Sequence, residues 1–104
     1  MLVYKETLPT DTLWGKTVSL PYATAEEASR AVMKTALQYG TPCMWYQADG
    51  MAEKREYLIK AIGTGHDWED TLSMEQYIGT VLFDEDTLVL HYFIMDIEKW
   101  RNEK

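Results

Sequence analysis

The stretch QYIGTVLFDEDTLVLHYFIM, residues 76–95, decides the fold. Its two flanks, 76–83 and 87–95, are rich in β-branched and aromatic residues, which favour extended chain. Between them stands the acidic triplet 84–86, which is typical of a turn. The stretch therefore predicts a β-hairpin.

Similar short segments lie on the N-terminal side of this hairpin, separated by turn residues such as Pro9, Gly40 and Asp49-Gly50. They predict strands at 2–8, 16–22, 43–48 and 55–63. Short strands at this spacing are typical of antiparallel sandwiches and barrels. We expect a mainly β, single-domain antiparallel sandwich or partly open barrel of about six strands with one short helix.

Residues 24–39 allow two interpretations. Thr24 and Glu27 form a capping box, so a helix begins at Ala25. Beyond it, apolar residues fit both helical and alternating spacing, so local periodicity does not fix where the helix ends. The alternative fold is therefore α+β, with one helix over 25–39 packed on an antiparallel sheet.

Length and composition bound the class of protein. The chain has 104 residues, which predicts a single β-rich domain over 1–95 followed by a polar C-terminal tail over 96–104. Its formal net charge of −7 argues against direct binding of nucleic acid or an anionic membrane surface. Cys43 is the one cysteine and the start MLVYKETLP lacks a signal-peptide pattern, so we expect a cytoplasmic protein.

Several short motifs occur in a recognisable order. They are Gly40, Pro42, Cys43 and Trp45, then Gly63 to His66, Tyr77 to Thr80, and finally Leu88, Val89 and His91. Over about residues 30–94 this order resembles an uncharacterised family of small β-rich proteins encoded by phages and prophages. The resemblance implies that 31–39 is strand, and that the protein comes from a phage or prophage and works inside a bacterial host cell. Residues 23–30 and the segment after Met95 depart from the family pattern.

The turn Gly63-Thr64-Gly65-His66 and the acidic, aromatic residues after it form the candidate binding site. A Gly-x-Gly turn cradles phosphate when a helix N-terminus follows, but carboxylates follow here. A tryptophan ringed by acids suits a basic protein surface instead. The candidate binding residues are Thr64, His66, Asp67, Trp68, Glu69, Asp70 and His91.

No catalytic set or cofactor is predicted. Two histidines and one cysteine, without metal-ligand spacing, make a thin ligand set, so we expect no metal. Pairing of Cys43 with His66 or His91 would need a hydrogen-bond contact that spacing does not predict. Cys43 is better interpreted as a small buried side chain.

Three functions remain. The leading hypothesis is a small phage-type accessory protein that binds a bacterial host protein without catalysis. Its expected contact surfaces are residues 64–75 and 23–30. A more specific form of this hypothesis is that the partner has a basic surface. An inhibitor of a host or defence protein is its most concrete version. The alternatives are a small-ligand binder or minor enzyme using Thr64, His66 and His91 at the mouth of a barrel, and a homo-oligomeric module paired through an edge strand.

Overall fold

The computed structural model describes residues 1–66, 72–84 and 87–97 of the chain. Within these ranges, seven strands, one α-helix and one 3₁₀ turn follow in the order β1 Leu2–Thr7, β2 Lys16–Leu20, α1 Ala25–Ala31, β3 Val32–Gln38, β4 Thr41–Ala48, β5 Arg55–Gly63, η1 Met74–Gln76, β6 Tyr77–Phe83 and β7 Leu88–Asp96. The mainly β prediction is confirmed.

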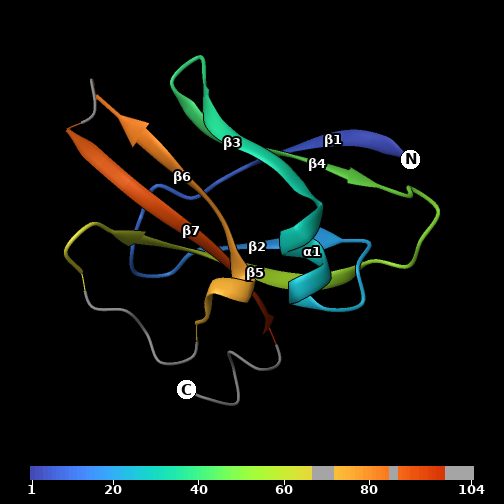
Figure 1. The fold of residues 1–104 in the computed structure, drawn as a ribbon. Helices are drawn as coiled ribbons and strands as arrows, with labels where there is room; N and C mark the ends of the chain where they lie inside the picture. Colours follow the sequence, from blue (N-terminus) through green and yellow to red (C-terminus); the bar gives the residue numbers. More distant parts are fainter. Residues whose placement is uncertain (67–71, 85–86, 98–104) are drawn as a thin grey trace.

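The strands form two antiparallel sheets. One has the order β1-β4-β3 and the other the order β2-β5-β7-β6. Figure 1 shows the three-stranded sheet in the upper half of the molecule, β2 and β5 below it, and α1 at the side between them. The predicted hairpin is the β6–β7 pair, with Phe83 opposite Leu88 and Thr80 opposite His91. In the described part of the chain no ladder joins the two sheets, so the fold is a sandwich rather than a closed barrel.

The alternative helix over 25–39 is wrong. Thr24 caps α1 as predicted, its hydroxyl accepting from the amide of Glu27, while the Glu27 carboxylate accepts from the amide of Ala23. The helix then stops at Ala31, because Val32 takes an extended conformation and pairs with Tyr46 of β4. Cross-strand pairing and burial, rather than local periodicity, decide this boundary.

The main core lies between the two sheets. It is built from the inward-facing residues of each sheet and from Ala25 and Ala28 of α1. The central strands contribute Ile59 from β5 and Tyr92 and Ile94 from β7, all fully buried.

A second apolar cluster covers the other face of the four-stranded sheet. Its buried members are Leu58, Ile62, Leu72, Phe93 and Met95. Strands β5 and β7 are therefore buried on both faces. The last strand includes Asp96, and Ile97 beyond it is buried, while residues 98–104 of the expected tail lie outside the described residues.

One side of the sandwich is closed by close packing between β3 and β6. The Thr35 hydroxyl donates to the carbonyl of Thr80 at 3.2 Å, and the Thr35 side chain lies directly over Gly79. Gly79 has a φ of 152°, and a Cβ atom there would lie 2.2 Å from Thr35 Oγ1. Glycine is thus required by both the backbone conformation and the contact.

None of the helices in the described part of the chain has the length and apolar character needed to span a membrane.

Replacing Gly79 with alanine should lower the free energy of unfolding by about 2–4 kcal/mol, because the new methyl group forces Thr35 away and strains the backbone. Urea denaturation measures this change. Gly40→Ala is the matched control, since Gly40 also has a positive φ of 81° but a Cβ there meets no atom within 4 Å. The Gly40→Ala control should lower the free energy of unfolding by about 1 kcal/mol. Equal losses in the two variants would show that the β3–β6 contact has no energetic role.

Candidate functional site

The structure places three of the predicted site residues at the same end of the four-stranded sheet. Thr64 and His66 follow β5, and His91 lies in β7 opposite Ile62. The other four, Asp67, Trp68, Glu69 and Asp70, lie outside the described residues.

His91 is held by hydrogen bonds at both ring nitrogens. Its Nε2 lies 2.8 Å from Thr64 Oγ1, and its Nδ1 lies 2.9 Å from Thr80 Oγ1. Thr80 in turn is hydrogen-bonded to the hydroxyl of Tyr77. A histidine engaged at both nitrogens has no free lone pair for a metal or a substrate. We therefore assign His91 to a network that ties the end of β5 to β6 and β7.

His66 has a different environment. Its amide donates to the carbonyl of Gly63 at 3.1 Å, which closes a tight turn, and its side chain is exposed. The imidazole lies against Gly63, where a Cβ atom would come within 2.9 Å of the ring. The first glycine of the turn therefore makes room for the histidine ring.

An open groove of about 550 Å³ lies beside this turn. It is lined by Thr10, Asp11, Thr12, Gly63, Thr64, His66, Thr87, Leu88, Val89 and Leu90. Three separate connections meet here: the loop between β1 and β2, the exit from β5, and the start of β7. Thr64 and His66 thus share a groove, whereas His91 is not among its lining residues. The two histidines therefore do not both line this groove, although convergence of the pair on one cavity would favour the ligand-binding alternative.

The loop from Asp11 to Gly15 forms one rim of the groove and is tightly fixed. Asp11 Oδ1 accepts from the amides of Leu13 at 3.0 Å, Trp14 at 2.7 Å and Gly15 at 3.3 Å. These bonds, led by that from Trp14, lower the pKa of Asp11 below its ordinary value. The Lys60 ammonium donates to the carbonyl of Leu13 at 3.2 Å.

Gly15 fixes the other end of this loop. Its φ is 80°, and a Cβ atom there would lie 2.4 Å from the carbonyl oxygen of Ile59. The loop backbone therefore packs directly on β5.

Two large apolar side chains project from this fixed loop. Leu13 is 72% exposed and Trp14 is 74% exposed. Exposed tryptophans on monomeric proteins are uncommon, and tryptophan is enriched among the residues that dominate binding energy at protein interfaces. The tip of the β3–β4 hairpin projects at the top of the sandwich in Figure 1. Tyr39, at this tip, is 99% exposed.

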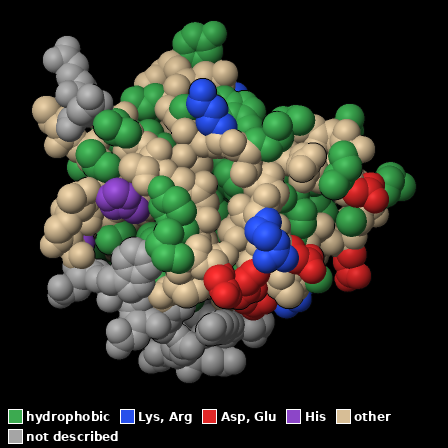
Figure 2. Space-filling model, viewed as in Figure 1, with side chains coloured by type: hydrophobic (Ala, Val, Ile, Leu, Met, Phe, Trp, Pro, Cys, Tyr) green, Lys and Arg blue, Asp and Glu red, His purple; other side chains and the backbone are tan. Residues whose placement is uncertain are grey.

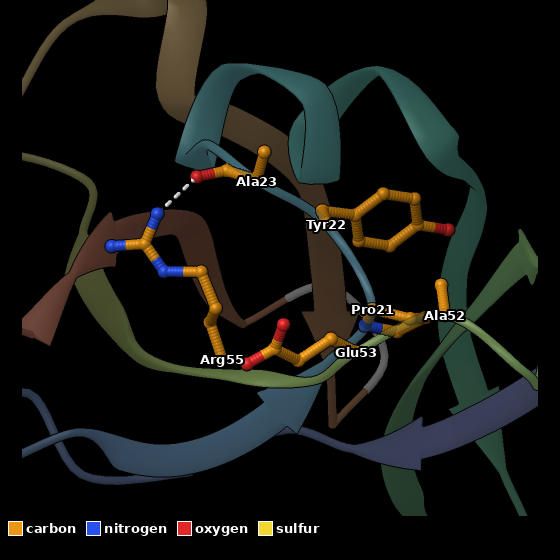
Figure 3. A pocket seen from close by; sticks show the side chains of 6 residues that line it. All are labelled: Pro21, Tyr22, Ala23, Ala52, Glu53 and Arg55. Carbon is orange, nitrogen blue, oxygen red and sulfur yellow. Dashed lines mark hydrogen bonds between the residues drawn. The ribbon is translucent and has the colours of Figure 1, made fainter.

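A second groove, of about 470 Å³, lies near α1 and is lined by Pro21, Tyr22, Ala23, Ala52, Glu53 and Arg55. Figure 3 shows the Arg55 guanidinium turned toward the carbonyl of Ala23 and the Tyr22 hydroxyl pointing away from the groove. Arg55 also forms an ion pair of 2.9 Å with Asp96 of β7. The Tyr22 hydroxyl donates to the carbonyl of Gln47. These side chains hold the fold together, so this groove is the weaker candidate.

Acidic side chains gather on α1 and η1, as the red group in the lower part of Figure 2 shows. Glu26, Glu27 and Glu75 belong to these two elements. The segment 23–30, expected as a contact surface, therefore carries an acidic face, but Ala25 and Ala28 within it are buried.

Metal and cysteine chemistry find no support among the described residues. None of the histidine, cysteine, aspartate and glutamate side chains in 1–66, 72–84 and 87–97 form a group of three placed to hold a metal ion. Cys43 is buried in β4 of the three-stranded sheet, and its Sγ lies 3.5 Å from the carbonyl of Thr41. His91 belongs to the other sheet, where its ring is hydrogen-bonded to Thr64 and Thr80 and not to Cys43.

The sequence model of one protein family, described as a domain of unknown function (DUF7352), matches residues 1–103. The chain belongs to this family. The match extends beyond 30–94 and includes residues 23–30 and most of the segment after Met95. No curated protein and no solved structure matches the chain.

Within this DUF7352 domain, the sequence did not predict the role of Asp11 or of Thr80. The order Asp-x-x-x-Gly over 11–15 could have indicated the role of Asp11, because an aspartate side chain commonly accepts hydrogen bonds from amides two and three residues later. Thr80 meets His91 through strand register, which the local sequence does not contain.

Replacing Thr80 with valine should destabilise the domain by about 1–2 kcal/mol, because His91 Nδ1 and the Tyr77 hydroxyl lose their partner while the side-chain shape is kept. Thermal or urea unfolding measures the change. Thr17→Val is the control, since Thr17 is exposed on β2 and has no side-chain partner among the described residues; it should change stability by less than about 0.5 kcal/mol. If Thr80→Val behaves like the control, the network does not stabilise the fold.

Proposed function

We propose that this chain is a small accessory protein of phage or prophage type that acts by binding a bacterial host protein and not by catalysis. Inhibition of a host or defence protein in the bacterial cytoplasm is the concrete form of this proposal. The observation that carries it is the pair Leu13 and Trp14, both more than 70% exposed on a loop fixed at three backbone amides.

A fixed loop supports binding because it lowers the entropic cost of association. A flexible loop must be ordered when it binds, and each immobilised side chain then costs about 0.5–1.5 kcal/mol. Here Asp11, Lys60 and Gly15 hold the backbone before any partner arrives. The two apolar side chains are thus presented in a defined geometry, as interface anchors require.

The arrangement of polar groups does not favour a reaction. Among the described residues, His91 is engaged at both nitrogens, Cys43 is buried on the other sheet, and His66 has no hydrogen-bonded base or nucleophile. A binding role needs none of these groups. It needs an exposed anchor beside a recess, and the groove of about 550 Å³ next to the loop supplies that recess.

Replacing Trp14 with alanine should abolish partner capture while leaving the fold intact, because its side chain is mostly in solvent. The measurement passes bacterial lysate over the immobilised protein and quantifies retained proteins by mass spectrometry. Met51→Ala is the matched control, since Met51 is 93% exposed in the connection between β4 and β5. A protein retained by the wild type and by the control should fall at least about tenfold with Trp14→Ala.

Two results contradict the proposal. One is a retained set that is identical for the wild type and Trp14→Ala. The other is the absence of any protein enriched over a column without the domain.

A further inference from the structure

The described residues that line the groove beside the loop include one carboxylate, that of Asp11, and neither lysine nor arginine. Asp11 Oδ1 accepts all three loop amides, and no lysine or arginine among the described residues forms an ion pair with the carboxylate. A carboxylate held ionised in this way attracts a cation.

Two hydroxyl-bearing residues flank Asp11 in the chain and line the same groove. The hydroxyls of Thr10 and Thr12, on either side of Asp11, have no hydrogen-bond partner within the ranges that the structure describes. By contrast, Thr64 is bonded to His91, and the Thr87 hydroxyl donates to the carbonyl of Asp84. The free acceptors therefore lie on one rim, the loop from Thr10 to Thr12.

Part of the lining is apolar. Leu88, which is 44% exposed, lines the groove at the start of β7, and the buried Leu90 and half-buried Val89 follow it. A long cationic side chain suits such a groove, since its methylene groups pack on apolar surface while its charged end meets the acceptors.

Arginine fits this set of groups better than lysine. Its guanidinium offers five N–H donors in a plane and binds a carboxylate through two of them, with others left for hydroxyl oxygens. Lysine offers three donors at a single point.

We propose that this groove receives an arginine side chain of the partner protein, with Asp11 as its counter-ion and Thr10 and Thr12 as further acceptors. The proposal rests on the protein-binding function and names the feature that the partner must present. The volume of about 550 Å³ has room for the side chain and adjoining backbone. The net charge of −7 would speed the approach of a partner with a basic surface.

The test uses N-acetyl-arginine amide as the probe and N-acetyl-citrulline amide, its neutral analogue of the same shape, as the matched control. Amide signals of the isotope-labelled full chain are followed by NMR at neutral pH. The arginine probe should shift the signals of groove residues saturably, with a dissociation constant in the millimolar range, and the citrulline probe should bind at least about fivefold more weakly.

The variant Asp11→Asn removes the charge and keeps the oxygen that accepts the loop amides. It should weaken arginine binding at least about fivefold. Asp49→Asn is the matched control, because Asp49 Oδ1 accepts from the amide of Met51 at 2.9 Å in the connection between β4 and β5 and does not line the groove. That variant should bind the probe as the wild type does.

Four outcomes overturn the proposal: equal binding of the citrulline and arginine probes, tighter binding of N-acetyl-lysine amide, no loss with Asp11→Asn, or no arginine-dependent shifts at about 50 mM probe. These failures are distinct from failure of the protein-binding function. If Trp14→Ala loses a captured partner while the arginine probe does not bind, the loop contacts a partner but the groove does not recognise arginine.

Discussion

Burial of β5 and β7 on both faces is the constraint on which the other elements depend. Their inward side chains, Ile59, Tyr92 and Ile94, need a second sheet over them, and their outward side chains, including Phe93 and Met95, need cover on the opposite face. The three-stranded sheet and α1 meet the first need, and the segment containing Leu72 contributes to the second. A chain of this size has one modest core, and these two strands occupy its centre.

The buried central strands position the connections at one end of the sheet. The loop of Asp11 to Gly15 packs on β5 through Gly15 and Lys60, so the position of the loop is set by a buried strand. The turn of Thr64 to His66 is likewise tied to β7 through His91. The groove lies between two connections fixed to the same pair of strands, which is why its shape is defined without a ligand.

Much of the fold was predictable from the sequence, because period-two alternation and turn residues are local signals. All the expected strands are present, with seven in place of about six, and the 31–39 strand implied by the family resemblance is β3. The sequence did not predict that α1 ends at Ala31, because the apolar residues after it fit both helical and strand spacing. Pairing of β3 with β4 decides this boundary. The arrangement around the candidate site was less predictable from local sequence. The Gly63–His66 turn does line a groove, but its opposite rim comes from Asp11, some fifty residues earlier, and His91 faces threonines that strand register brings to it.

The central claim is that Leu13 and Trp14 are exposed on a loop that is already ordered in the free protein. The ¹⁵N heteronuclear NOE of their backbone amides, measured without any partner, tests this most directly. The hydrogen bonds from both amides to Asp11 predict values equal to those of β5 and β7. Values as low as those of a mobile chain terminus would contradict the claim, because the loop would then have to be ordered on binding.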